Sequence, residues 1–149
     1  MKWNQNQSVR LSQICIALFT VAFVLLCFFS PGLLRYFIGS RGEDPGKLPL
    51  FLITVYSTAL PALLVLAALW QMLKRIRKGV VFVQENVAAL RLISWCCMVA
   101  GAVYLLSSLY YATYFLLGLA GIFMGLILRV VKNIFAEAVE IKLENDYTI

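Results

Sequence analysis

Residues 48–73 read LPLFLITVYSTALPALLVLAALWQML and contain no Asp, Glu, Lys or Arg. As an α-helix rising 1.5 Å per residue, this run is about 39 Å long, which exceeds the roughly 30 Å of hydrocarbon in a bilayer. A charge-free apolar run of this length predicts a transmembrane helix. Pro49 suits the first turn of such a helix, whereas Pro61 removes a hydrogen bond in mid-span and predicts a kink.

Three further charge-free apolar runs flank this one, at residues 11–30, 92–114 and 115–128. The last two are contiguous, so we place a tyrosine-rich turn between them and expect four spans, at about 11–30, 48–73, 92–111 and 112–131. A mean hydropathy of +0.88 and a charged fraction of only 13% agree, because soluble domains carry about 25% charged residues. The sequence predicts a single all-α membrane domain over residues 1–149, folded as a four-transmembrane-helix bundle.

The basic residues fall mainly on one side of these spans. Ten Lys and Arg lie before the first span, between the second and third, and after the fourth, against three in the 31–47 connection and none in the tyrosine-rich turn. The positive-inside rule therefore predicts that both termini are cytoplasmic. The net charge of +6 fits cytoplasmic retention and contact with anionic lipid head groups at the inner face, so we expect no direct nucleic-acid partner.

The second helix is expected to continue past the bilayer into the cytoplasm. Its charge-free run is followed by the basic residues 74–78 and by Gly79, and glycine is typical of the position just past a helix C-terminus. Residues 80–91 then carry apolar side chains on one helical stripe, at Val83, Val87 and Leu90. This spacing predicts a cytoplasmic amphipathic helix over residues 80–91 that leads into the third span.

The fourth helix is expected to extend in the same way, as a cytoplasmic tail over residues 132–149 with one apolar face. Packing of Phe82 against Phe135 would hold this tail beside the segment that follows the second span. The tail is acidic and residues 74–78 are basic, which suggests contact between them. Their pairing stays a hypothesis, because exposed ion pairs contribute only about 0.2–1 kcal/mol each.

Two of these cytoplasmic stretches have a familiar pattern. One reads Lys78-Gly79-x-x-Phe82-x-x-Glu85-Asn86-x-x-x-Leu90-Arg91, and the other is the terminal Glu144-Asn145-Asp146-Tyr147-Thr148-Ile149. With four spans around them, they resemble a family of small bacterial membrane proteins known as domain of unknown function 2975, in which leucine is more frequent at the place of Tyr147. The resemblance implies a multi-pass protein of the bacterial cytoplasmic (inner) membrane with no established activity. It also implies a candidate partner, a small helix-turn-helix regulator.

No catalytic or metal-binding pattern stands out in the chain. The sequence has no His, which removes the commonest general base and His-based zinc sites. Its four cysteines lie in apolar runs without a C-x-x-C spacing and are expected to pack as small apolar residues, although the adjacent Cys96 and Cys97 could bind a soft metal. Glu43 and Asp44 could hold a divalent cation, but two adjacent acids fit a solvated turn better than a calcium site. We therefore predict a non-enzymatic protein with no cofactor and no metal site.

Small residues in the fourth span predict where helices approach closely. Gly118, Gly121 and Gly125 form a groove on one helix, and such grooves favour helix association in lipid. We expect this groove to pack within the bundle, with Gly101 as a facing residue. A homo-oligomer contact is the alternative.

Two classes of function remain open. The first is a regulatory or interaction protein that presents a cytoplasmic-face site to a cytosolic regulator or another membrane subunit. The alternative is a small transporter or channel subunit, with Pro61 as a hinge and the hydroxyl groups of residues 54–58 along a path. The first is preferred because the distinctive residues lie outside the spans. The candidate interaction site consists of Phe82, Glu85, Asn86, Arg91, Phe135, Glu144, Asn145 and Asp146.

Overall fold

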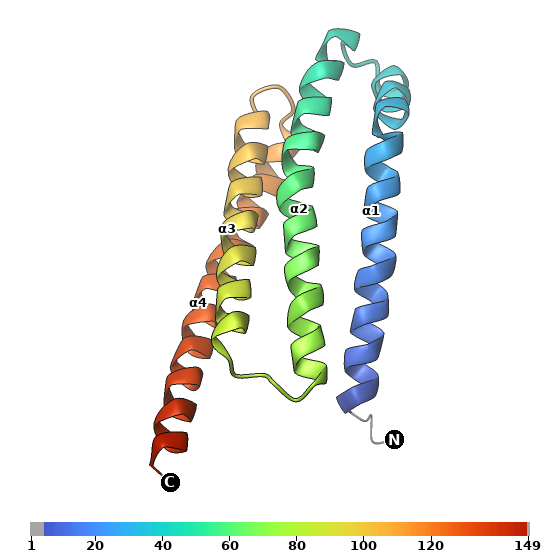
Figure 1. The fold of residues 1–149 in the computed structure, drawn as a ribbon. Helices are drawn as coiled ribbons and strands as arrows, with labels where there is room; N and C mark the ends of the chain where they lie inside the picture. Colours follow the sequence, from blue (N-terminus) through green and yellow to red (C-terminus); the bar gives the residue numbers. More distant parts are fainter. Residues whose placement is uncertain (1–4, 149) are drawn as a thin grey trace.

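The computed structural model describes residues 5–148, and their side chains from Ser8 onward. It contains four long helices and one short 3-10 helix (Figure 1): α1 at Gln5–Arg41, η1 at Pro45–Lys47, α2 at Leu48–Arg77, α3 at Gln84–Ser107 and α4 at Thr113–Tyr147. No strand occurs in the described range. All four long helices are apolar enough to cross a bilayer, so the chain is an all-α, multi-pass membrane protein.

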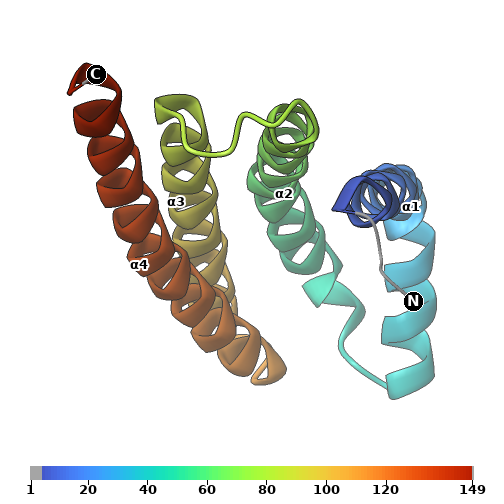
Figure 2. The ribbon, with the colours of Figure 1, turned by 90° about the horizontal axis from the view of Figure 1, so that it is seen from below.

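The four helices stand side by side in chain order and do not close into a ring (Figure 2). Over residues 5–148 the helix backbones approach one another only in the pairs α1–α2, α2–α3 and α3–α4. The predicted bundle is therefore an open row in which α1 and α4 do not meet. Lipid tails are as apolar as leucine side chains, so no hydrophobic force drives the row to close.

Helix α1 is longer than predicted, because it continues through Pro31 to Arg41. The expectation that a loop begins at residue 31 is wrong. Proline removes a backbone hydrogen bond and crowds the preceding turn, which bends a helix without always ending it. In Figures 1 and 2 the final turns of α1, drawn in cyan, run across the axis of its earlier part.

Helix α2 runs uninterrupted through Pro61 to Arg77. Near the proline, hydroxyl groups bond to backbone carbonyls: Ser57 Oγ donates to Thr54 O over 3.1 Å, and Thr58 Oγ1 donates to the same oxygen over 2.8 Å. Gly79 follows the helix with φ +78°, the left-handed conformation expected just past a C-terminus.

The connection from α2 to α3 departs from the prediction of a helix over residues 80–91. Residues 80–83 are not helical, and α3 begins at Gln84. The reason is a Schellman-type end to α2, in which the Val80 N–H donates to Arg75 O over 3.0 Å. From Gln84 onward the predicted stripe is present, since Val87 and Leu90 are buried while Glu85 and Arg91 are exposed.

At the opposite end of the row, aromatic side chains join α2 to the turn between α3 and α4. Phe51 is buried and packs edge-on against three tyrosines, with ring centroids 5.4–5.9 Å apart. Those tyrosines are Tyr110, Tyr111 and Tyr114. Such aromatic pairs contribute about 0.5–1.5 kcal/mol beyond the area that they bury. The cluster therefore fixes this end of α2 against the α3–α4 turn.

Candidate functional site

The α2–α3 connection is held in one conformation by Asn86, whose side chain is completely buried. Its Nδ2 donates to Val81 O over 2.7 Å and to Val80 O over 3.4 Å, and its Oδ1 accepts from Arg75 Nη1 at 3.5 Å. These carbonyls have no helical partners, so the amide replaces the helix hydrogen bonds that the connection lacks. A buried amide whose nitrogen and oxygen both have hydrogen-bond partners specifies one local geometry.

Phe82 lies on this connection and contacts α4. Its ring centroid is 5.7 Å from that of Phe135, although the Phe82 side chain is still 43% exposed. The predicted contact between these two residues is therefore present. Glu85 is exposed on the first turn of α3, where a carboxylate interacts favourably with the helix dipole. We call Phe82, Glu85, Asn86 and Phe135 the connection platform.

Arg91, the next predicted site residue, lies in a different hollow. It lines a cavity of about 240 Å³ between α3 and α4, together with Ser94, Trp95, Arg129, Lys132 and Asn133. The guanidinium carbon of Arg129 lies 4.8 Å from the centroid of the Trp95 ring, a cation–π contact. Three cations thus line one hollow. Spacings of four residues (Arg91 and Trp95) and three residues (Arg129 and Lys132) could have indicated it in the sequence.

The acidic end of α4 stands apart from the connection platform. Val139 is the last buried residue of α4, and residues 140–148 are all exposed. Within residues 8–148 the only ion pair joins Lys47 and Glu43, so the hypothesis that the acidic tail pairs with residues 74–78 is not met. Glu144, Asn145 and Asp146 therefore belong to a helix end without packing partners, which projects past the start of α3 in Figure 1.

Close packing of α3 on α4 fixes the position of the connection platform relative to the hollow lined by Arg91, Arg129 and Lys132. A Cβ atom on Gly101 would lie 2.8 Å from Ile122 N and 2.9 Å from Gly118 O, so only glycine fits there. Gly121 and Gly125 also face α3, and Ser94 Oγ donates to Gly125 O over 2.7 Å in a buried hydrogen bond. The glycine groove thus packs inside the molecule, against the residue that its spacing predicts.

Hydroxyl groups of α2 are bonded to α3. Thr54 Oγ1 and Ser107 Oγ are 2.7 Å apart, and Thr54 Oγ1 also contacts the hydroxyl of Tyr110. Thr58 Oγ1 lies 3.5 Å from Tyr104 OH. These bonds are the ordinary use of hydroxyls between membrane helices.

Both carboxylates of the turn between α1 and α2, Glu43 and Asp44, have partners within the turn. Glu43 Oε2 accepts from Lys47 Nζ at 2.8 Å, and Asp44 Oδ1 accepts from Gly46 N at 2.9 Å as the cap of η1. The hydrogen bond that Lys47 donates to Glu43 raises the pKa of Lys47 above its ordinary value, as do the nearby negative charges. This arrangement agrees with a solvated turn.

No curated protein and no solved structure matches the chain. A family model described as "Protein of unknown function (DUF2975)" matches residues 5–149, nearly the whole length. The chain therefore belongs to the DUF2975 family, whose function is unknown.

Proposed function

We propose that the protein is a membrane-bound interaction protein without enzymatic activity, which presents the connection platform and the free end of α4 to a protein partner. The partner is a cytosolic regulator, such as a small helix-turn-helix protein, or another membrane subunit. The observation that carries this proposal is the platform itself. Asn86 fixes a non-helical connection so that Phe82 is held against Phe135 while remaining 43% exposed.

The platform has the features of a small binding surface. Exposed aromatic residues on a rigid support are the usual anchors of protein interfaces, because they bury a large area with little loss of side-chain entropy. The free end of α4 adds four exposed carboxylates, which can steer a basic partner: Glu137, Glu140, Glu144 and Asp146. The open row leaves further apolar helix faces for a membrane subunit.

The distribution of Lys and Arg supports a cytoplasmic location for this surface, in a bacterial inner membrane. The connection lies at the same end of the row as the beginning of α1 and the end of α4 (Figure 1). Of the twelve Lys and Arg among the described residues, nine belong to the segments at that end. The 52 Å or so of α4, at 1.5 Å per residue, exceeds the hydrocarbon thickness, so part of this helix would extend into the cytoplasm.

Photocrosslinking in cells tests this proposal. A photoreactive residue at Phe82 and, separately, at Tyr147 should capture the same protein, because both positions flank the proposed surface. The control is Leu109, which is 89% exposed in the turn at the opposite end and should not capture it. Asn86→Ala should reduce capture from Phe82, whereas Asn133→Ala, an exposed asparagine of α4, should not. Recovery of only lipid, or only of the chain itself, would refute the proposal.

A small transporter or channel subunit is the second candidate function. It is favoured by a cavity of about 410 Å³ between α1, α2 and α3 that reaches the side chains of Ser30, Thr58 and Tyr104. Flux measurements in proteoliposomes test it: Thr58→Ala should reduce a flux that Thr20→Ala leaves unchanged. Crosslinking that is unaffected by Asn86→Ala, together with a flux lost on Thr58→Ala, would favour this candidate over the first.

A further inference from the structure

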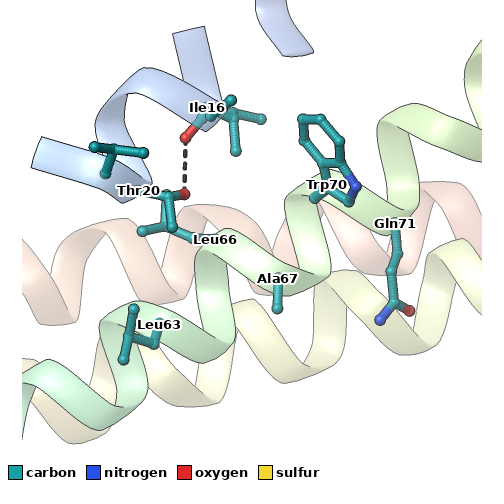
Figure 3. A pocket seen from close by; sticks show the side chains of 9 residues that line it. Ile16, Thr20, Leu63, Leu66, Ala67, Trp70 and Gln71 are labelled. Carbon is teal, nitrogen blue, oxygen red and sulfur yellow. Dashed lines mark hydrogen bonds between the residues drawn. The ribbon is translucent and has the colours of Figure 1, made fainter. Parts of the chain in front are cut away.

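The contact between α1 and α2 is the loosest in the row, and a groove lies between these two helices. Of the three helix pairs, α1–α2 has the sparsest contact. Only 6% of the most apolar stretch of α1 is buried, against 11% for α4, 22% for α2 and 28% for α3. Between α1 and α2 lies a cavity of about 540 Å³ (Figure 3), a volume within the range of small-molecule sites. It is lined by Ile16, Ala17, Thr20, Val21, Leu63, Leu66, Ala67, Trp70 and Gln71.

The walls of this groove are almost entirely apolar. Thr20 is one of the few polar residues, and its hydroxyl donates to Ile16 O over 2.8 Å, as Figure 3 shows. This hydrogen bond within α1 leaves the methyl group and the neighbouring aliphatic side chains to form the surface. The groove therefore suits a hydrocarbon chain better than a polar solute.

At one end the groove becomes strongly basic. A second cavity, of about 430 Å³, shares Ala17 and Trp70 with the first and is lined also by Arg10, Gln13, Ile14 and Arg77. Lys74 adds a third cation, with its Nζ 5.9 Å from the centroid of the Trp70 ring. The two cavities adjoin at Ala17 and Trp70, so the apolar groove leads to a mouth that is lined by cations.

The cations at the mouth have hydrogen-bonding capacity left over. Arg77 Nη1 donates to Gln13 Oε1 at 3.5 Å, a long contact that uses one of its five N–H groups. No ion pair within residues 8–148 involves Arg10, Lys74 or Arg77, and the sequences of α1 and α2 contain no Asp or Glu. Arginine recognises phosphate through paired N–H donors, which the mouth can provide from two helices.

From this juxtaposition we infer that the α1–α2 groove is a binding site for an anionic phospholipid, with the phosphate at Arg10 and Arg77 and an acyl chain along the groove beside Trp70. Basic pockets at the ends of membrane helices select anionic head groups in this way. The helices of a second copy would fill the apolar part but would bring cations to the mouth, because the residue that borders each apolar run at this end is basic: Arg10, Lys74, Arg91 and Arg129. The nearest carboxylates, Glu85 and Glu137, lie further along the chain, so charge complementarity favours the lipid. The site is separate from the connection platform, and its test does not depend on a protein partner.

Quenching of Trp70 fluorescence tests the inference. In a Trp3→Phe/Trp95→Phe variant, Trp70 is the only tryptophan, and it lies in both cavities. Phosphatidylglycerol with brominated acyl chains should quench it at a lower mole fraction than brominated phosphatidylcholine of the same chain length. We expect the preference to fall about fivefold for each arginine removed, in Arg10→Ala and Arg77→Ala.

Matched variants distinguish a specific site from general attraction to charge. Arg35→Ala/Arg41→Ala removes two exposed arginines near the other end of α1 and should leave the preference unchanged. Ala67→Phe, on the groove wall, should weaken quenching by both lipids, whereas Ala120→Phe on an exposed position of α4 should not. Equal quenching by the two lipids, or equal effects of both arginine pairs, would overturn the inference. The inference would also be overturned if quenching were weak and became stronger when the protein is diluted in the bilayer. Dilution separates the copies, so that result would mean that a second copy occupies the groove.

Discussion

Gly101→Ala should destabilise the contact between α3 and α4, and the structure sets the size of the effect. The added Cβ would lie 2.8 Å from Ile122 N and 2.9 Å from Gly118 O. Both atoms belong to the backbone, so the clash is relieved only by moving one helix away from the other. Overpacking of this kind costs about 1–3 kcal/mol, and the higher helix propensity of alanine returns about 0.5–1 kcal/mol. The expected net loss is about 1–2 kcal/mol.

Gly32→Ala is the matched control, because Gly32 is also helical and its added Cβ would meet no atom within 4 Å. The free energy of unfolding of both variants is measured by titrating SDS into detergent-solubilised protein and following Trp95 fluorescence, in a background where Trp3 and Trp70 are phenylalanine. Gly32→Ala should be neutral or slightly stabilising. If Gly101→Ala were as stable as Gly32→Ala, α3 and α4 would not pack through their glycines, and the row would have to be arranged differently.

Three further perturbations test other parts of the structure. Asn86→Ala leaves two carbonyl oxygens of the connection without their donor, so we expect a loss of about 1–3 kcal/mol in the same SDS titration and faster proteolysis at residues 80–83; unchanged proteolysis would show that the amide does not fix the connection. Ser94→Ala removes the 2.7 Å hydrogen bond to Gly125 O and should lower the free energy of unfolding by about 0.6–2 kcal/mol. An equal loss in Ser12→Ala, at an exposed position, would show that this hydrogen bond has no specific role. Glu43→Gln should lower the pKa of Lys47 toward its ordinary value, as measured by NMR titration. Because the pKa of Lys47 is raised in the folded protein, any stabilisation is present below the unfolded pKa and is lost as the pH rises through the folded one; an unchanged Lys47 pKa would show that the ion pair does not form.

The sequence predicted the four long apolar helices well, because hydrocarbon thickness and charge exclusion act on each helix separately. It also predicted the glycine contact, since a groove of small residues has few uses in lipid other than close approach. The contact of Phe82 with Phe135 followed from two apolar positions on helices that were expected to lie side by side.

The sequence could not predict features that depend on competition between local structures. Pro31 is compatible with a helix end or with a bend, and the choice depends on turns that lie up to ten residues later. Residues 80–83 have helical periodicity, but the Asn86 side chain satisfies their carbonyls instead of the helix backbone. The sequence also could not predict that the helices form an open row, because apolar periodicity in a span does not distinguish a face covered by protein from one covered by lipid.

The proposed function requires that the α2–α3 connection and the end of α4 lie together on the cytoplasmic side. Labelling of single cysteines in spheroplasts with a membrane-impermeant thiol reagent tests it most directly, in a background where Cys15, Cys27, Cys96 and Cys97 are alanine. A cysteine at Phe82 or Tyr147 should react only after the membrane is permeabilised, whereas one at Leu109 should react in intact spheroplasts. Reaction at Phe82 or Tyr147 in intact spheroplasts would place the proposed surface outside the cell and contradict the account.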